Sequence, residues 1–179
     1  MKKPRILAHI CCAPDALYVI QILKDNYQVS GYFYNPNIHP KEEYDLRLKE
    51  TRNIADIINF ELTEENYEKD KWFKMIEGFE QEPEKGKRCD ICYAMRLDRT
   101  AKKAKEMGYD IFTTIMTISP WKKSAKINQI GRMLANKYKI KFLEADFKKK
   151  DGFKKSVELS KKYNLYRQDY CGCTFSRKS

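Results

Sequence analysis

Residues 5–24 read RILAHICCAPDALYVIQILK. The short apolar stretch at 6–10 predicts a buried β-strand over residues 5–10. Pro14 is favoured in the first turn of a helix, and the apolar residues after it predict a helix that continues to the end of the stretch. The adjacent Cys11 and Cys12 therefore lie in the loop of a strand–loop–helix unit.

The same alternation continues along the chain. Further strands are expected at 27–34, 60–62, 110–115 and 141–147, separated by helical segments that include 124–138 and 153–163. Strands that alternate with helices predict a parallel sheet with helices on both faces. We expect a single α/β domain over residues 1–179, Rossmann-like and doubly wound with about five strands, in which 164–179 form a C-terminal tail.

Such a sheet is expected to have the strand order 3-2-1-4-5. The chain would then reverse its direction of winding between strands one and four, and ligands bind at that point, outside the carboxyl ends of the strands. The loops there are residues 11–15 and 116–123. The first two cysteines therefore fall where open sheets bind ligands.

All six cysteines occur in closely spaced pairs that are far apart in the sequence. The pairs are Cys11 with Cys12, Cys89 with Cys92, and Cys171 with Cys173. Metal chelation and dithiol redox chemistry both need sulfurs delivered two at a time at short spacing. The second pair is expected at the start of a helix, where it faces the positive end of the helix dipole. We expect all three pairs to reach one cofactor site.

Four thiolates from the first two pairs could bind a structural zinc ion or an iron–sulfur cluster. Directly adjacent cysteines reach a single small ion awkwardly, whereas a cubane with separated irons accepts neighbouring ligands more easily. The pattern favours the cluster over zinc. It favours either of them over a role for Cys11 and Cys12 as ordinary buried residues.

Cys171 and Cys173 are left over from a four-cysteine site and flank a glycine. They could form a reversible disulfide, strained and easily reduced, or hold a second metal together with Asp15. The position of Asp15 is also typical of an acidic residue that stabilises a helix N-terminus electrostatically. Both roles stay open from the residues alone.

Several side chains suit substrate binding. Tyr166, Arg167 and Gln168 offer an aromatic face and polar groups of the kind that hold a flipped base or a sugar-like ring. His39 lies in a polar turn and could also contact a substrate. His9, at the end of the first strand, is more typical of a packed core histidine than of a ligand.

The chain carries 36 Lys and Arg against 25 Asp and Glu, a formal net charge of +11. Such a surface attracts polyanions such as nucleic acids, although a lysine-rich solvated surface would have the same composition. The sequence shows neither a secretory leader nor an apolar run of the roughly 20 residues that cross a bilayer. We expect a cytoplasmic protein with reduced cysteines and no membrane partner.

With these residues in view, the chain resembles the cobalamin-independent epoxyqueuosine reductases, which catalyse the last step of queuosine synthesis in tRNA. The resemblance spans nearly the whole chain. The matching segments are 9–15, 31–40 with Glu43, Tyr44 and Arg47, 89–92 with Arg96 and Leu97, Thr113 and Thr114, Ser119 and Pro120, 146–149 with Gly152 and Ser156, and 166–173.

The resemblance implies a HUP-like fold and a two-electron removal of the epoxide oxygen from epoxyqueuosine at the tRNA wobble position, without cobalamin. As ligands of a 4Fe-4S cluster it implies Cys11, Cys12, Cys89 and Cys92. It also implies that Cys171 and Cys173 form a redox-active pair or, with Asp15, surround an adjacent mononuclear iron. The implied partners are the anticodon arm of tRNA and an external low-potential electron donor.

One segment departs from the adenine-nucleotide-binding enzymes that share this type of fold. Those enzymes carry a glycine- and serine-rich loop after the first strand, whereas residues 11–15 read CCAPD and lack the flexibility and hydroxyls that cradle phosphate. We expect a metal cofactor in the crevice and no use of ATP. Two other functions are consistent with the sequence: a metal-free thiol–disulfide oxidoreductase and a zinc-stabilised RNA-binding module.

Overall fold

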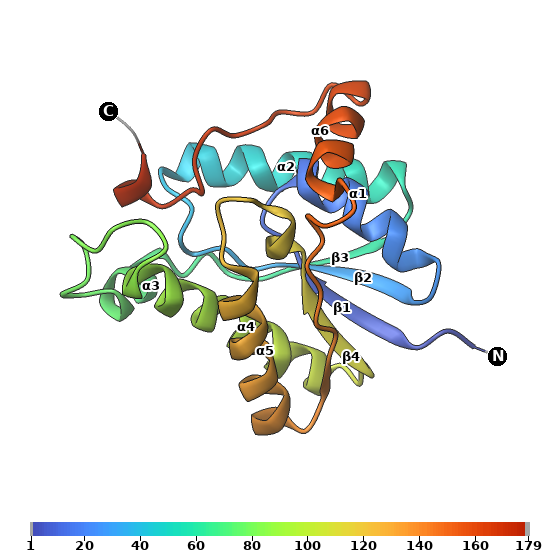
Figure 1. Cartoon of the computed structure of the whole chain (residues 1–179), viewed down its shortest axis with the longest axis horizontal. Coiled ribbons are helices and arrows are strands. Elements are labelled where there is room, and N and C mark those ends of the chain that lie inside the picture. The colour runs from blue at the N-terminus through green and yellow to red at the C-terminus, as the bar shows by residue number, and fades with distance from the viewer. Residues whose placement is uncertain (1, 178–179) are drawn as a thin grey trace.

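The computed structural model describes residues 2–177 and contains one parallel five-stranded sheet (Figure 1). The strand order is β3-β2-β1-β4-β5, which confirms the expected order and the doubly wound topology. The strands are β1 (Arg5–His9), β2 (Gln28–Phe33), β3 (Glu61–Glu64), β4 (Ile111–Thr114) and β5 (Lys141–Phe142).

Helices cover both faces of the sheet. On one face α1 packs against α2 and α6, and on the other α4 packs against α5, with α3 beside α4 (Figure 1). None of the helices described between residues 2 and 177 has the length and apolarity to cross a membrane. The helices are α1 (Ala13–Lys24), α2 (Lys41–Ile57), α3 (Lys69–Met75), α4 (Lys87–Glu106), α5 (Ser124–Tyr138) and α6 (Gly152–Lys162), with the 3₁₀ turns η1 (Ile115–Ile118) and η2 (Thr174–Ser176).

Strand β1 is the centre of the core. It pairs with β2 on one side and β4 on the other, and Ile6, Leu7 and Ala8 are completely buried. A strand of a parallel sheet that is buried on both faces reads as a continuous apolar run, which explains why residues 5–10 were recognisable. The loops that follow β1 and β4 therefore lie side by side at the carboxyl edge of the sheet.

The fifth strand is shorter than expected, since it ends at Phe142 instead of continuing to 147. Side chains replace the missing strand partner beyond that point. Thr113 donates its hydroxyl hydrogen to the Leu143 carbonyl oxygen at 3.0 Å, and Asn128 Nδ2 donates to the Ala145 carbonyl oxygen at 3.1 Å. The Leu143 N–H still donates to the Phe112 carbonyl oxygen at 3.0 Å, and beyond that bond side chains take over from the ladder as the segment leaves the sheet.

His9 belongs to the core, as its position at the end of β1 predicts. Its side chain is completely buried, with Nδ1 3.1 Å from Thr114 Oγ1 and Nε2 3.0 Å from the Tyr34 carbonyl oxygen. Burial lowers the pKa of His9 to about 3. Burial likewise lowers the pKa of His39 to about 4. Both imidazoles are therefore neutral in the folded protein at neutral pH.

The two buried histidines predict a loss of stability in mild acid. Histidine in the unfolded chain gains a proton below about pH 6.5, whereas the folded His9 stays neutral down to about pH 3, so falling pH favours unfolding throughout that window. Between pH 7 and pH 5 His9 alone is expected to cost about 2 kcal/mol. Urea unfolding of the wild type and of His9→Gln at both pH values measures the part of the free energy of unfolding that is due to His9.

The expected result is a smaller loss of stability on acidification in His9→Gln than in the wild type. His39→Gln serves as the matched variant, because the pKa of His39 is shifted in the same direction. The double variant should then lose the least stability. Equal losses in the wild type and all three variants would contradict the linkage.

Candidate active site

A pocket of about 300 Å³ brings two of the three cysteine pairs together. Cys89 and Cys92 reach it from α4, and Cys171 and Cys173 reach it from the C-terminal tail. Asp15, in the first turn of α1, also lines this pocket. Segments that are far apart in the sequence therefore converge on one site, as the spacing of the pairs predicts.

Cys11 and Cys12 lie in the loop between β1 and α1, close to Asp15. Both thiols are buried, and their sulfurs and one carboxylate oxygen of Asp15 all lie within 4.8 Å of one another. A hydrogen bond from the Cys12 thiol lowers the pKa of Cys11 to about 6 and raises that of Cys12. Cys11 is therefore a thiolate at neutral pH, the form that binds metals. Asp15 joins this group to the pocket.

The second pair is held by the beginning of α4. Cys89 lies in the first turn, where the Lys85 backbone N–H donates to its Sγ at 3.3 Å. Cys92 lies in the second turn, so only Cys89 directly faces the positive end of the helix. Burial raises the pKa of both thiols, which metal coordination would counteract by favouring the thiolates.

The third pair has two thiols of opposite character. The Cys171 Sγ lies 2.8 Å from Ser176 Oγ and accepts the Cys173 backbone N–H at 3.4 Å. A hydrogen bond from the Cys173 thiol lowers the pKa of Cys171 well below its ordinary value and raises that of Cys173. One thiolate beside one thiol suits either metal coordination or dithiol redox chemistry.

Unpaired polar atoms show that the pocket is built to hold polar groups. Four buried side-chain atoms on its lining have no hydrogen-bond partner among residues 2–177: Asn37 Oδ1, Trp72 Nε1, Arg88 Nε and Gln168 Oε1. A buried donor or acceptor without a partner costs free energy unless a ligand completes it. The two N–H donors suit the sulfurs of a thiolate-bound cluster, and the two oxygens suit substrate hydroxyls.

The pocket also contains uncompensated positive charge. Arg88 and Arg96 are buried on its lining, and within the described part of the chain neither forms an ion pair with a carboxylate. Buried guanidinium groups require negative partners, which thiolates and an anionic cluster supply. The donor set and its surroundings therefore fit a 4Fe-4S cluster. Arg96 follows Cys92 by one helical turn, a spacing from which its place beside the thiol could have been predicted.

The predicted substrate residues divide into two groups. Arg167 and Gln168 line the pocket, and Arg167 Nη2 lies 3.6 Å from Asp15 Oδ1. Tyr166 instead donates its hydroxyl hydrogen to Glu43 Oε2 at 2.9 Å, away from the pocket lining. His39 is buried and its ring centroid lies 4.7 Å from that of Phe73. Substrate contact by Tyr166 and His39 stays a prediction.

Comparison with known proteins identifies the family. The family model described as epoxyqueuosine reductase QueH matches residues 6–179. Epoxyqueuosine reductase QueH of Streptococcus pyogenes serotype M1 is 41% identical over 182 residues, which cover 98% of this chain and 71% of that protein. The protein of the same name from Thermotoga maritima is 36% identical over 174 residues, which cover 96% of this chain and 89% of that protein.

Two solved structures with a similar fold have names that refer to tRNA modification. The U34-tRNA thiolase NcsA from Methanococcus maripaludis, with its [4Fe-4S] cluster, gives a TM-score of 0.60 at 13% identity and covers 99% of this chain and 62% of its own. A predicted tRNA methyltransferase subunit from Methanocaldococcus jannaschii gives the same TM-score and identity and covers 86% and 76%. At this identity the likeness shows the fold alone. The family match and the relatives together show that the chain belongs to the epoxyqueuosine reductase QueH family of oxidoreductases.

Proposed function

We propose that this chain removes the epoxide oxygen of epoxyqueuosine at the wobble position of tRNA, which yields queuosine. Its membership of the QueH family supports this activity. The observation that carries the proposal is the convergence of two distant cysteine pairs on one pocket, together with Asp15, whose carboxylate lies within 4.8 Å of the sulfurs of Cys11 and Cys12. Such a site suits electron transfer to a bound substrate.

The reaction consumes two electrons and two protons. Both C–O bonds of the epoxide break, a double bond forms between the two carbons, and the oxygen leaves as water. The electrons come from an external low-potential donor. When bound, a 4Fe-4S cluster on the first two cysteine pairs and an adjacent mononuclear iron would supply single electrons and a Lewis acid for the epoxide oxygen, without cobalamin.

The chain's own residues bind and orient the substrate and handle the protons. The carboxylate of Asp15 lies at the pocket wall and is oriented by Arg167, so it can pass a proton to the leaving oxygen. The unpaired oxygens of Gln168 and Asn37 accept hydrogen bonds from hydroxyls of the substrate ring. The buried aromatic side chain of Trp72 forms part of the pocket lining and limits the access of water to the substrate.

Two roles suit Cys171 and Cys173. Their oxidation to a disulfide would release two electrons and two protons, the number that the reaction needs. Alternatively, with Asp15, which shares their pocket, they would hold the adjacent iron. The variants described in the Discussion separate the two roles.

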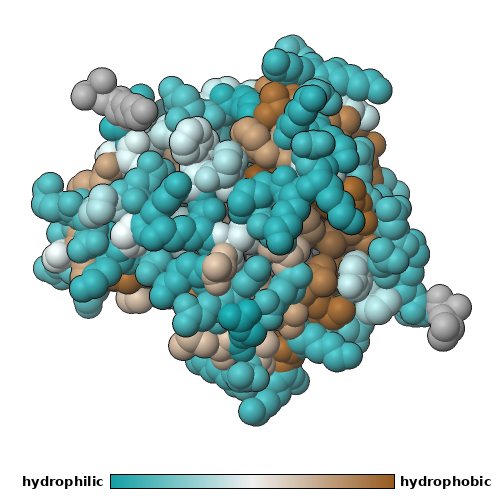
Figure 2. Space-filling model, in the orientation of Figure 1, coloured by the Kyte–Doolittle hydropathy of each residue, from teal (hydrophilic) through white to brown (hydrophobic). Residues whose placement is uncertain are grey.

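The surface beside the pocket suits RNA. Hydrophilic side chains cover most of the face shown in Figure 2, and the whole chain has a net charge of +11. On the pocket wall, Trp121 is 67% exposed and is followed by Lys122 and Lys123. An exposed indole next to lysines offers a base-stacking platform with phosphate contacts. We propose that this segment binds the anticodon arm of tRNA.

Replacing Trp121 by alanine is expected to weaken tRNA binding about 10-fold, because stacking on an aromatic side chain contributes about 1–3 kcal/mol per base. Fluorescence anisotropy with a labelled anticodon stem–loop measures the affinity. Met133→Ala is the control, since Met133 is 65% exposed and does not line the pocket. Unchanged affinity in Trp121→Ala, or an equal loss in the control, would argue against the stacking platform.

The proposed activity is tested with anaerobically purified protein, a low-potential reductant and tRNA that contains epoxyqueuosine. Conversion to queuosine, followed by mass spectrometry of nucleosides, together with roughly four iron and four sulfide per chain is the expected result. Full activity without iron would identify a thiol–disulfide oxidoreductase. One zinc per chain with tight tRNA binding and no turnover would identify an RNA-binding module.

A further inference from the structure

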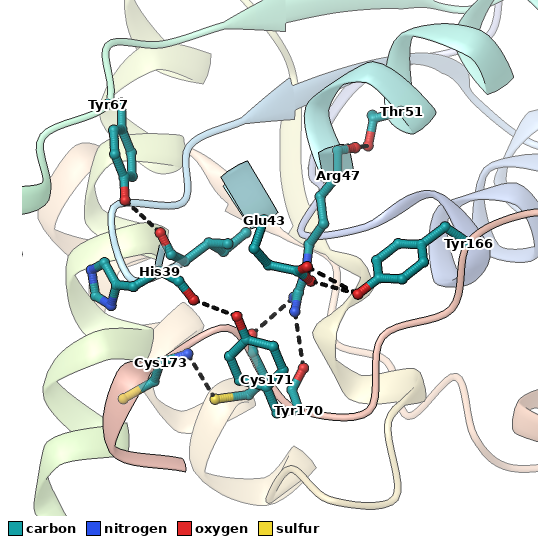
Figure 3. Close-up of polar contacts among 10 residues, drawn as sticks. His39, Glu43, Arg47, Thr51, Tyr67, Tyr166, Tyr170, Cys171 and Cys173 are labelled. Carbon is teal, nitrogen blue, oxygen red and sulfur yellow. Dashed lines mark hydrogen bonds and ion pairs between the residues drawn. The ribbon is translucent and has the colours of Figure 1, made fainter. Parts of the chain in front are cut away.

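The loop that carries the third cysteine pair is fixed by side chains and backbone from the beginning of α2 (Figure 3). Between α6 and η2 the tail contains no helix or strand that could hold it. Its two thiols nevertheless both line the pocket. The contacts that produce this arrangement come from residues 39–47, which lie more than a hundred residues earlier in the chain.

Three consecutive carbonyl oxygens of the loop accept hydrogen bonds from this region. Arg47 Nη2 donates to the carbonyl of Tyr170 and Arg47 Nη1 to that of Cys171, both at 3.0 Å. The backbone N–H of His39 donates to the carbonyl of Gly172 at 2.7 Å. Because one rigid guanidinium spans two successive carbonyls, it fixes the peptide planes on both sides of the Cys171 Cα.

Arg47 is itself held in place. Its Nε donates to Glu43 Oε1 at 2.7 Å, one helical turn earlier, and the two side chains are only 2% and 11% exposed. Glu43 also accepts the Tyr166 hydroxyl from the tail at 2.9 Å (Figure 3). The guanidinium carbon lies 5.3 Å from the ring centroid of Tyr170. This buried, charge-assisted pair holds the guanidinium in the orientation that faces the loop.

Gly172 shows how closely the loop packs on this region. Its φ of +112° is one that side chains disfavour. A Cβ at this position would lie 2.8 Å from Ile38 Cγ1 and 3.3 Å from Arg47 Nη1. The glycine between the two cysteines therefore allows the backbone to approach the guanidinium.

We propose that Arg47, oriented by Glu43, is a positioning residue that directs the thiols of Cys171 and Cys173 into the pocket. It acts through the loop backbone and does not line the pocket itself. The inference rests on the proposed function only where it assigns chemistry to these thiols. The arrangement of the loop can be tested without turnover.

The test compares Arg47→Met, which keeps the apolar stem but removes all donors, with Arg52→Met in the same helix. Arg52 is 56% exposed and pairs with Glu64 on the surface. In anaerobic protein with its cofactor in place, the rate of iodoacetamide alkylation of each cysteine is measured by mass spectrometry. Arg47→Met should raise the rates at Cys171 and Cys173 about 10-fold, as expected for loss of buried hydrogen bonds, and leave those of the other cysteines unchanged.

Two further variants test the same role of Arg47. Arg47→Lys retains the positive charge but has no planar guanidinium that could donate to two carbonyls at once. It should therefore also raise the alkylation rates of Cys171 and Cys173. If Arg47→Met does not fold, Glu43→Gln is tested in its place. It should raise the alkylation rates of Cys171 and Cys173 about 3-fold. In both Arg47 variants kcat should fall while KM for tRNA stays unchanged, since Arg47 does not contact the substrate.

Wild-type alkylation rates in the Arg47 variants, or an equal rise at all six cysteines, would overturn the assignment. The Arg52→Met control should match the wild type in both assays. A wild-type protein that lacks reductase activity would refute the proposed function. The alkylation comparison would still decide the role of Arg47.

Discussion

Cys92→Ser is expected to lower the iron content from roughly four atoms per chain to below one and to reduce the reductase rate at least about 100-fold. Serine keeps the size of the side chain but replaces a soft thiolate ligand with a hydroxyl that binds iron poorly. Cys92 is buried beside Arg96, so the change also removes the negative charge that a metal-bound Cys92 thiolate would place next to the guanidinium. Iron and sulfide analysis and the absorption spectrum measure the loss.

Ala94→Ser provides the matched control for this variant. Ala94 lies in α4 two residues after Cys92 and is half-buried, so the substitution places a serine in the same helix without removing a sulfur. It should retain iron, colour and activity. A Cys92→Ser protein with full iron content would remove Cys92 from the ligand set and would refute the four-cysteine assignment.

Cys171→Ser is expected to reduce turnover by a similar factor of about 100 while the four irons and sulfides of the cluster remain. Cys171 is not one of the four proposed cluster ligands, and the pKa of its thiol lies well below the ordinary value. The change removes the reactive thiolate and leaves Cys173 in place. Iron content and single-turnover kinetics with tRNA separate loss of chemistry from loss of the cluster.

The same variant distinguishes the two roles of the third pair. If Cys171→Ser loses about one iron atom per chain while its cluster stays intact, Cys171 is a ligand of a second iron. If the iron content of the variant is unchanged and the oxidised wild type has two fewer free thiols than the reduced wild type, Cys171 and Cys173 form a disulfide. Thr174→Ser in the same segment is exposed and should behave as the wild type. Full turnover in Cys171→Ser, or loss of all iron, would contradict the division of labour between the pairs.

The order of the elements and the residue types of the site could both be predicted from the sequence. The run at 6–10 is apolar because β1 is buried on both faces, and the cysteines are recognisable because metal and redox chemistry require them in pairs. The sequence could not show that the fifth strand stops at Phe142, because Thr113 and Asn128 satisfy the backbone beyond it from other elements.

The charges and hydrogen bonds that surround those sulfurs depend on how the elements pack and could not be predicted from the sequence. Nothing in local patterning shows that Arg88 and Arg96 are buried without carboxylate partners, or that Arg47 spans two carbonyls more than a hundred residues away. Periodicity reports which side of an element faces the core, whereas such contacts depend on how elements pack. The six cysteines are therefore identifiable from the sequence, whereas the packing of α2, α4 and the tail places the thiols of the second and third pairs in the pocket.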